Sequence, residues 1–536
     1  MKKLFVLALV VMAVALFGVS FVGAQDTVIK IASQSPLSGP QSVLGIGIRN
    51  GVELAIEQLG APLTDAGFTV EFVPFDDQAT PDVGVANAQQ MVNDPAILAV
   101  VGHLNSGVAI PSSEVYEANA VAMVSPANTN PRITDRGLLT ANRVCGRDDL
   151  QGPTGARYAA ETLGVSSVYV LHDTTAYGEA VANFFQIEAE AQGLTVLGFE
   201  GTTEAANFEG IITPILALEP DLIYFGGIYS QTAIFINQAR AAGFEGAFMG
   251  PDGFDSSEFA AIAGEAGVGT YFTSVAGPAS LYPAAAQFIE DYTAKFGEGP
   301  QPFSAQAYDS AGVILAAMAS IVADGGELTR ESVRDAVRAT EGYEGLTANI
   351  TFDRNGDPET GLYYVFQVTT ADAAAWGENE LLTSLEIPSP LVARGSVVDI
   401  AAGNEAFSTL VAAVTAAGLG ETLAGEGPFT VFAPTNDAFT AALTELGMAA
   451  EDVLANTELL TGILTYHVVP GVVLSGALTD GMEVTTVNGA TFTVNVSDAG
   501  VTITDGMGRT ANVVTADIQG TNGVVHVIDN VILPPM

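Results

Sequence analysis

The sequence predicts an α/β fold with parallel sheets, arranged in two lobes and followed by a smaller domain. Short and almost wholly apolar runs alternate with amphipathic stretches long enough for a helix, and this is the order strand, helix, strand. The alternation occurs in two successive series, which predicts two lobes of similar construction. After Arg394 the composition changes to a unit rich in Val and Thr with turn residues throughout, which indicates a separate domain.

The first series of predicted strands comprises Val28–Ala32, Val70–Phe75, Ile97–Gly102 and Val121–Val124. The second series comprises Val168–His172, Leu194–Phe199, Leu222–Gly226 and Ala247–Gly250. Helices are predicted over Val43–Leu59, Val83–Val92, Tyr177–Gln192 and Ser230–Ala242. Because the strands are nearly continuous in apolar residues, we expect each sheet to be parallel and covered by helices on both faces.

Residues 371–395 are predicted to form a linker. They are rich in alanine and acidic residues and include Ile387-Pro388-Ser389-Pro390. Proline prevents regular pairing and stiffens a chain, so we expect no sheet strand here. The C-terminal domain would then occupy residues 396–536.

The N-terminus resembles a secretory signal peptide. Lys2 and Lys3 precede an apolar stretch that runs to about Val22, and Val22-Gly23-Ala24 fits a small-x-small cleavage site. We therefore expect a signal peptide over 1–24, with retention as a membrane anchor as the alternative. No cysteine follows the stretch, so a lipid anchor is not expected, and no later segment is expected to cross a membrane. These features predict export to the periplasm or the outer cell surface.

Charge and cysteine content narrow the range of partners. The chain carries 61 acidic and 17 basic side chains, a formal net charge of −44. Such a surface repels nucleic acid and anionic lipid, so no nucleic-acid partner is expected, and a solubility adaptation explains the charge. Cys145 is the only cysteine, which excludes an intramolecular disulfide. We interpret it as a small buried apolar group rather than a nucleophile.

A set of motifs follows in order along the first part of the chain: Pro36-Leu37-Ser38-Gly39-Pro40, Asp76-Asp77, Gly102-His103-Leu104-Asn105-Ser106, Ser125-Pro126-Ala127-Asn128-Thr129-Asn130-Pro131, Gly146-Arg147-Asp148-Asp149-Leu150-Gln151-Gly152-Pro153, His172-Asp173, Tyr177-Gly178, Gly226-Gly227-Ile228-Tyr229 and Phe248-Met249-Gly250-Pro251-Asp252-Gly253. In this order they resemble the branched-chain amino-acid-binding proteins of ABC importers, the type I periplasmic binding proteins, over about 27–370.

That resemblance implies a fold, a function and partners. It implies one lobe of about 27–148 and 276–349, and a second lobe of about 149–275 and 350–370. It further implies a receptor that closes its hinge on an amino-acid-like small molecule and delivers it to the membrane subunits of an ABC permease. No cofactor and no metal are expected.

Most of these motifs directly follow predicted strands, where open α/β sheets bind ligands and helix amino ends offer N–H groups to anions. An amino acid needs donors for its carboxylate and an anion for its ammonium group. The resemblance gives the first role to the hydroxyls of Ser106 and Thr129 and the backbone N–H of Ala127, and the second to Asp252 across the cleft. Each has a structural alternative, because Ser and Thr cap helices and Asp before Gly forms turns.

The resemblance also places Tyr177, Tyr229 and Leu44 at the ligand. Many relatives have an aromatic residue where Leu44 stands, and Tyr-Tyr where this chain has Ile228-Tyr229. An apolar pocket is still expected, and with it a branched-chain or other apolar amino acid.

The final part carries three further motifs: Phe429-Thr430-Val431-Phe432-Ala433-Pro434-Thr435-Asn436-Asp437-Ala438-Phe439, Tyr466-His467-Val468-Val469-Pro470-Gly471 and Asn522-Gly523-Val524-Val525-His526-Val527-Ile528-Asp529. These resemble a fasciclin domain, which implies an α+β fold over about 396–536. The family is broadly associated with adhesion, so this domain is expected to bind a cell wall or matrix. His467 and His526 are candidate metal ligands, but a packed structural role is expected because no cluster at metal spacing surrounds them.

Other functions fit the sequence less well. An enzyme needs a nucleophile with a base in reach, and only a pairing of Ser106 with His103 is conceivable, without any reaction-specific motif. The protein is therefore expected not to be an enzyme. Asp353–Asp357 resembles a calcium loop, but its glycine comes fourth instead of sixth, so an Asn-Gly turn between strands is preferred. The alternative function is a surface sensor or adhesin that binds an amide or organic acid without transport.

Overall fold

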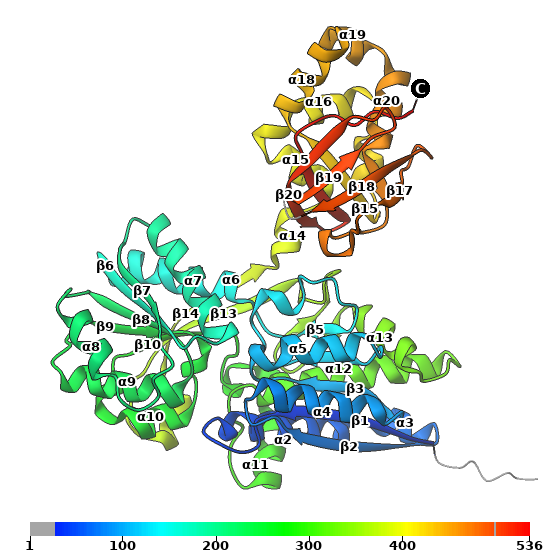
Figure 1. The fold of residues 1–536 in the computed structure, drawn as a ribbon. Helices are drawn as coiled ribbons and strands as arrows, with labels where there is room; N and C mark the ends of the chain where they lie inside the picture. Colours follow the sequence, from blue (N-terminus) through cyan, green and yellow to red (C-terminus); the bar gives the residue numbers. More distant parts are fainter. Residues whose placement is uncertain (1–26, 498–499, 536) are drawn as a thin grey trace, which may run out of the picture.

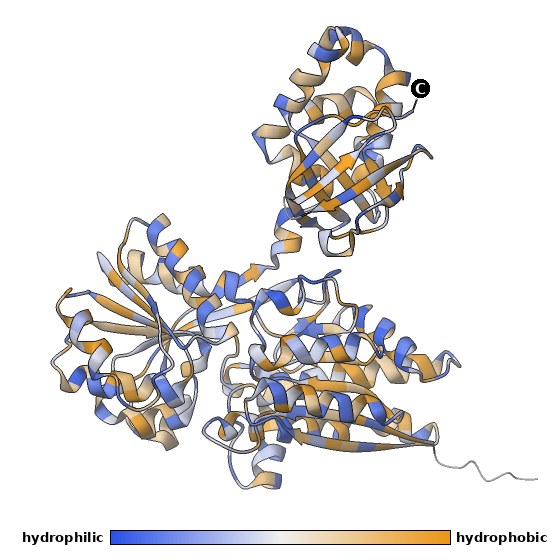
Figure 2. Cartoon of the chain, in the orientation of Figure 1, coloured by the Kyte–Doolittle hydropathy of each residue, from blue (hydrophilic) through white to orange (hydrophobic). Residues whose placement is uncertain are grey.

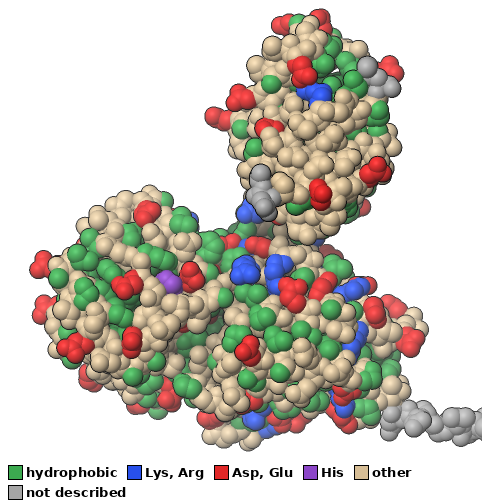
Figure 3. Space-filling model, in the orientation of Figure 1, with side chains coloured by type: hydrophobic (Ala, Val, Ile, Leu, Met, Phe, Trp, Pro, Cys, Tyr) green, Lys and Arg blue, Asp and Glu red, His purple; other side chains and the backbone are tan. Residues whose placement is uncertain are grey.

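The computed structural model describes residues 27–497 and 500–535, so the expected signal peptide lies outside the described residues. Two lobes lie side by side, and the C-terminal domain stands apart from them on a short connection (Figure 1). Apolar residues concentrate in the strands and on the inner faces of the helices (Figure 2). Acidic side chains are scattered over all three units (Figure 3).

Lobe 1 is built on a five-stranded parallel sheet with the order β2-β1-β3-β4-β5. Its strands are β1 (Thr27–Ser35), β2 (Phe68–Asp76), β3 (Ile97–Gly102), β4 (Ala122–Ser125) and β5 (Ala141–Arg143). Its helices are α2 (Ser42–Leu59), α3 (Ala61–Asp65), α4 (Pro81–Asn93), α5 (Ser106–Glu117), η1 (Pro131–Ile133), η5 (Ala279–Leu281), η6 (Pro283–Ala285), α11 (Ala286–Phe296), α12 (Ser304–Ala323) and α13 (Arg330–Arg338), and a short hairpin joins β11 (Tyr343–Glu344) to β12 (Asn349–Ile350).

Helix α12 forms the centre of this lobe. It packs along α2, and its residues are buried over most of their length. Of the residues that the structure describes, only this helix is long and apolar enough to cross a membrane, but 72% of that stretch is buried inside the protein. The expectation that no later segment would reach this length and apolarity was wrong, because a core helix enclosed on all sides needs no polar face.

Lobe 2 contains a seven-stranded sheet with the order β14-β13-β10-β9-β8-β6-β7. Its strands are β6 (Ser167–His172), β7 (Thr195–Gly201), β8 (Leu222–Gly226), β9 (Ala247–Gly250), β10 (Tyr271–Ser274), β13 (Thr360–Gln367) and β14 (Glu380–Pro388), and β13 pairs antiparallel with both β10 and β14. Its helices are α6 (Asp148–Tyr158), η2 (Ala159–Leu163), α7 (Ala176–Ala191), α8 (Glu209–Leu216), α9 (Tyr229–Ala241), η3 (Asp252–Phe254), α10 (Ser257–Ala263), η4 (Gly264–Gly267) and η7 (Ala373–Glu378). The strands and helices predicted in both series are confirmed, with ends shifted by a few residues.

The predicted linker at 371–395 is wrong over most of its length. β14 pairs with β13 from Glu380 to Pro388, and η7 places Trp376 in the lobe 2 core. Most residues of β14 are exposed or half-buried, because it is the edge strand. An edge strand of this kind lacks the apolar run that marks a buried strand. Pro388, which has no N–H group to donate, is tolerated at the end of this edge strand.

A buried charge cluster joins the lobes where the chain crosses between them. The side chain of Asp357 accepts hydrogen bonds from Nε of Arg143 and Nη1 of Arg147, both at 2.6 Å. Asp357 lies in a turn, in which the N–H groups of Asn355 and Asp357 donate to Oδ1 of Asp353. The chain before this turn forms only one bridge, between Phe352 and Pro358, because the backbone turns immediately.

The C-terminal domain has a seven-stranded sheet with the order β16-β15-β21-β20-β19-β18-β17. Its strands are β15 (Phe429–Pro434), β16 (Val468–Pro470), β17 (Met482–Thr485), β18 (Thr491–Ser497), β19 (Gly500–Thr504), β20 (Thr510–Gly520) and β21 (Gly523–Ile528). Its helices are α14 (Pro390–Arg394), α15 (Val397–Ala402), η8 (Glu405–Phe407), α16 (Ser408–Ala416), α17 (Gly420–Ala424), α18 (Asn436–Leu446), α19 (Ala450–Ala455), α20 (Thr457–Tyr466) and η9 (Ser475–Ala477).

Both histidines of this domain are buried and hydrogen-bonded. His467 lies 2.8 Å from the carbonyl of Ile463 through Nδ1, and its Nε2 accepts from the N–H of Ile532. His526 lies 2.8 Å from the carbonyl of Val473 through Nε2. Within 27–497 and 500–535, no group of three or more metal-ligating side chains comes together. These contacts agree with the structural role expected for both residues.

Few hydrogen bonds connect this domain to the lobes. Nη2 of Arg354 donates to the carbonyls of Gly520 and Gly523, at 3.0 and 3.1 Å. Nε2 of Gln519 donates to the carbonyl of Asp135 in lobe 1 at 3.2 Å. The domain therefore meets the lobes beside the turn that joins them.

Candidate ligand-binding cleft

A small cavity lies between the facing edges of the two lobes. Its volume is about 20 Å³, and it is lined by Leu44, Leu104, Asn105, Ala127, Tyr177, Ile228, Asp252, Gly253 and Phe303. All of them except Phe303 follow the carboxyl ends of strands in the two sheets, where α/β sheets bind ligands. The cavity has room for about one water molecule, so a ligand can enter only if the lobes or the lining side chains move apart.

Lobe 1 places hydroxyl and amide groups beside this cavity. Ser106 opens helix α5 and is almost fully buried. Its hydroxyl accepts from the N–H of Asn130 at 3.4 Å, which leaves the hydroxyl proton for another acceptor. Asn128 ties the two loops together, since its Oδ1 accepts from the N–H of His103 and its Nδ2 donates to the carbonyl of Leu104.

Ala127 and Thr129 flank Asn128 in the loop after β4. The N–H of Ala127 is directed at Oγ of Ser125 at 3.3 Å, a long bond that a stronger acceptor can replace. The Thr129 hydroxyl is fully buried and makes no hydrogen bond of good geometry among the described residues, although it lies near enough to the Asp148 carboxyl group to lower the pKa of that group. A buried polar group without a partner costs free energy, so Thr129 gains from a ligand.

Lobe 2 supplies a carboxylate held by a phenol. Tyr177 lies in the first turn of α7, where the Thr175 hydroxyl caps the helix by accepting from the N–H of Gly178. The Tyr177 hydroxyl donates to Oδ1 of Asp252 at 2.7 Å and accepts from the N–H of Gly253 at 2.8 Å. A Cβ on Gly253 would lie 2.4 Å from the carbonyl oxygen of Gly227, so only glycine fits beside Asp252.

A second buried carboxylate, Asp148, stands at the start of α6. Neither of its oxygens has a hydrogen-bond partner among the described residues. Burial, and then the charge of Asp252, raise the pKa of Asp148 well above its usual value, while the nearby Thr129 hydroxyl opposes this rise. Burial likewise raises the pKa of Asp252 to about 6. Asp252 lines the cavity and forms no ion pair among the described residues, which suits the cavity to a cation, while Asp148 is buried outside the lining.

The seven residues expected at the ligand do not all reach the cavity. Leu44, Ala127, Tyr177 and Asp252 line it, and Ser106 and Thr129 are buried next to lining residues. Tyr229 is not among the lining residues, and its hydroxyl instead donates to the carbonyl of Pro40 at 2.8 Å. Ile228 takes its place, because residue 228 precedes α9 and faces the cavity whereas Tyr229 begins the helix.

Sequence reasoning missed Asp148 and Phe303. Asp148 lies in the motif Gly146–Pro153, and an acidic residue in the first turn of a helix can indicate a binding site. It is also the ordinary complement of a helix dipole, so the pattern alone did not separate the two roles. Phe303 precedes α12 outside every quoted motif, and only the packing of lobe 1 brings it to the cleft.

Hydrogen bonds across the cleft hold the lobes together around the cavity. Besides the bond from Tyr229 to Pro40, Nδ2 of Asn130 donates to the carbonyl of Ala176 at 2.5 Å. These bonds run from one lobe to the other, so the structure has the lobes in contact over the site. Opening the cleft must break them.

The groups considered for catalysis are engaged elsewhere. Nδ1 of His103 lies 3.5 Å from Asp77, and its Nε2 lies 3.4 Å from the Tyr116 hydroxyl. The imidazole therefore interacts with these two groups and not with the Ser106 hydroxyl. Cys145 is buried, and burial raises the pKa of its thiol far above the usual value. A thiol in this state is a poor nucleophile.

Comparison with known proteins decides the family. Residues 28–374 match the periplasmic binding protein family. The chain belongs to this family. Residues 405–534 match the fasciclin domain, so the chain of this binding protein ends in a fasciclin domain.

Named relatives of this binding protein are amino-acid-binding proteins. The leucine-, isoleucine-, valine-, threonine- and alanine-binding protein of Pseudomonas aeruginosa is 34% identical over 359 residues, 66% of this chain and 93% of that protein. A Leu/Ile/Val-binding protein homologue of Brucella abortus is 31% identical over 367 residues, 68% of this chain and 96% of that protein.

Solved structures share the two-lobed fold. A leucine-binding protein from Thermotoga maritima aligns with a TM-score of 0.60 at 30% identity, covering 67% of this chain and 98% of that one. A branched-chain amino-acid substrate-binding protein from Streptococcus pneumoniae, solved with isoleucine, has the same fold, with a TM-score of 0.59 at 23% identity, 68% of this chain and 100% of that one.

Proposed function

We propose that this protein is an extracytoplasmic receptor that captures an α-amino acid with an apolar side chain and delivers it to an ABC permease. The observation that carries the proposal is the pair of buried carboxyl groups, Asp148 and Asp252, beside the unpartnered hydroxyl of Thr129. An ammonium group in the cavity pairs with Asp252, which lines it, and is attracted by the nearby Asp148, while a carboxylate accepts from the hydroxyls of Thr129 and Ser106. The named relatives bind amino acids, which supports the same ligand class here.

The rest of the cavity is apolar, which favours a hydrocarbon side chain. Leu44, Leu104, Ile228 and Phe303 supply this surface. Burying apolar area stabilises binding by roughly 25 cal/mol per Å². Closing the lobes places Asp252 on the ammonium group in a site with little water, where the ion pair is stronger. The ligand therefore binds the closed form better, and this preference drives closure.

Calorimetry with leucine and two truncated analogues tests the ligand class. Isoamylamine lacks the carboxylate of leucine, and 4-methylpentanoate lacks the ammonium group. We expect leucine to bind far more tightly than either. For Asp252→Ala we expect a loss on the order of 2–5 kcal/mol, or about thirtyfold or more in affinity. Equal binding of 4-methylpentanoate and leucine, unaffected by Asp252→Ala, would show an organic acid or amide ligand instead.

The fasciclin domain is proposed to tether the receptor near its permease. The expected lack of a lipid anchor gives a reason for a tether in a cell with a single membrane, because linkage raises local concentration. In such a cell, deletion of residues 396–536 is expected to release the protein into the medium, with amino-acid affinity unchanged. Full surface retention after the deletion would remove the tether from the proposal. Loss of amino-acid uptake on deletion of the receptor tests delivery to the permease separately.

A further inference from the structure

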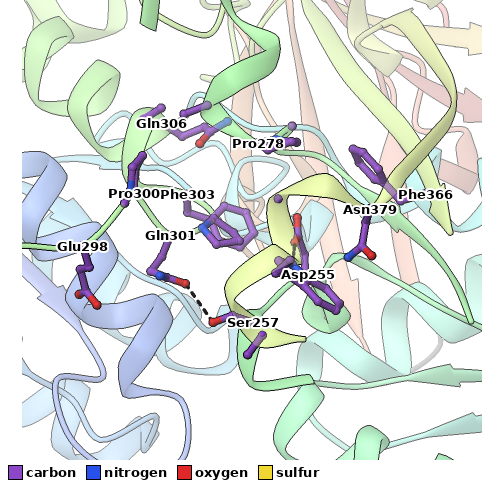
Figure 4. A pocket seen from close by; sticks show the side chains of 18 of the residues that line it. Asp255, Ser257, Pro278, Glu298, Pro300, Gln301, Phe303, Gln306, Phe366 and Asn379 are labelled. Atoms are coloured by element: carbon purple, nitrogen blue, oxygen red, sulfur yellow. Dashed lines mark hydrogen bonds between the residues drawn. The ribbon is translucent and has the colours of Figure 1, made fainter. Parts of the chain in front are cut away.

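A second and larger cavity lies between the lobes on the hinge side of Phe303. Its volume is about 480 Å³, and Phe303 lines both cavities, so its ring separates them. Lobe 1 contributes residues 298–306, and lobe 2 contributes parts of β10 and β13 with residues 373–379 (Figure 4). The last stretch belongs to the segment that looks like a linker in the sequence. The cavity therefore exists only because that segment folds back onto lobe 2.

Aromatic side chains form one wall of this cavity. Phe272 stacks between Phe366 and Trp376, with ring centroids 5.2 and 5.8 Å away. All three are buried side chains that line the cavity. Such a wall offers a flat apolar surface whose π-electrons attract a positive charge.

A buried carboxylate, Asp255, lies next to this wall. It is only 5% exposed, and Nε1 of Trp376 donates to its Oδ1 at 2.8 Å. The Ser274 hydroxyl is 3.3 Å from Oδ2, but it also donates to the carbonyl of Ala276 at 2.8 Å, and it has one proton for both. Burial raises the pKa of Asp255 to about 7. Among the described residues no Lys, Arg or His pairs with Asp255, so the carboxylate lacks a counter-ion.

We propose that this cavity is a second ligand site, which binds a small organic cation consisting of a primary ammonium group on an apolar body. The ammonium group pairs with Oδ2 of Asp255, the oxygen that is poorly satisfied. The apolar body lies over the rings of Phe272 and Trp376. An ammonium group here turns an uncompensated buried charge into a pair, and this gain drives binding.

The second site is connected to the first and to closure. Asp252 and Asp255 stand at the two ends of one helical turn, in which the N–H of Asp255 donates to the carbonyl of Asp252 at 2.9 Å. Residues from both lobes line the cavity, and Oγ of Ser257 in lobe 2 donates a hydrogen bond of 3.4 Å to Oε1 of Gln301 in lobe 1 (Figure 4). A ligand that touches both lobes binds the closed form better, so it is expected to strengthen amino-acid binding as well.

The chain offers its own probe, because Trp376 is its only tryptophan. We would titrate the mature chain with cyclohexylmethylamine and follow tryptophan emission, with calorimetry as the second measurement. The titration is made in saturating leucine, which keeps the first cavity filled. Cyclohexylmethanol and cyclohexanecarboxylate serve as neutral and anionic probes of similar shape. We expect saturable binding of the amine, and binding at least about tenfold weaker for both others.

Three variants separate the second site from the first. Asp255→Asn keeps the shape of the side chain, and it is expected to lower amine affinity at least about tenfold while leucine still binds. Glu265→Gln, which removes an exposed acid from the same lobe, is expected to change amine affinity less than about threefold. In Asp252→Ala, without leucine, the amine should still bind. Amine binding that survives Asp255→Asn, or that disappears in Asp252→Ala or in leucine, would overturn the proposal and place the amine in the first cavity.

Discussion

The phenol of Tyr177 donates a 2.7 Å hydrogen bond to Oδ1 of Asp252, a lobe 2 residue 75 positions later in the sequence. The same oxygen of Tyr177 accepts from the N–H of Gly253, so it fixes both the carboxylate and the backbone beside it. Three groups from two strand ends thus form one rigid unit. Preorganisation of this kind reduces the ordering that a ligand must impose.

Tyr177→Phe is therefore expected to weaken amino-acid binding without abolishing it. One hydrogen bond to a charged group is lost, which costs about 1.5–3 kcal/mol, or about ten- to a hundredfold in affinity. Calorimetry with leucine measures this. Tyr158→Phe, half-buried in the same lobe, is the matched control and should bind as the parent does. Parental affinity in Tyr177→Phe would show that the phenol does not position Asp252.

Binding of an amino acid near pH 7 is expected to release protons, because the ligand ammonium favours the ionised form of Asp148. Burial raises the pKa of this carboxyl group well above its usual value in the free protein, and pairing with the ligand ammonium opposes that rise. Calorimetry in buffers of different ionisation enthalpy counts the protons. Asp148→Asn should abolish the release, and the exposed Asp82→Asn should not. Identical proton release in Asp148→Asn would assign the proton to another group.

Asp357→Asn is expected to destabilise the two-lobed unit by about 3–5 kcal/mol, because Arg143 would remain as a buried charge with a weaker partner. Burial disfavours the ionised form of Asp357 and so raises its pKa, but Arg143 and Arg147 outweigh this and hold the pKa below its usual value. This stabilisation is present above the unfolded pKa of about 3.9 and is lost as pH falls through the folded pKa. Chemical denaturation measures the loss, with the exposed Asp335→Asn as control. A change below about 1 kcal/mol would contradict the role given to this cluster.

A fragment of residues 395–536 is expected to unfold cooperatively by itself. Its two apolar clusters lie within the domain, and few hydrogen bonds reach the lobes. Circular dichroism and calorimetry during heating test this. A broad transition without a calorimetric peak would mean that the lobes are needed for its folding.

The stability of the same fragment is expected to fall as pH drops from about 6.5 to about 4. Burial lowers the pKa of His467 to about 4 and also lowers that of His526. The unfolded chain therefore binds more protons than the folded one in this range, which makes folding less favourable as pH decreases. For His467 alone the loss is on the order of 3 kcal/mol. Melting temperatures of the parent and of His467→Gln across this range measure it, and equal slopes in both would exclude His467 as the source.

The sequence by itself determined the repeating strand-helix order, the two series of strands and the position of the C-terminal domain. Buried parallel strands such as Ile97–Gly102 and Leu222–Gly226 need apolar residues on both faces, and that requirement is local and visible in a single sequence. The motifs after those strands located Asp252, Tyr177 and Ala127, because the carboxyl ends of parallel strands meet at one edge of a sheet.

Only the tertiary structure decided which groups face the cavities between the lobes and which segments complete the lobes. β14 is an exposed edge strand, so its pairing depends on β13 and leaves no apolar pattern. Asp148, Phe303 and Asp255 acquire their roles from burial against residues far away in the chain. Burial decides whether a carboxylate is a solvated surface charge or an unpaired group that attracts a cation, and burial is a property of the packed lobes that no local stretch of sequence specifies.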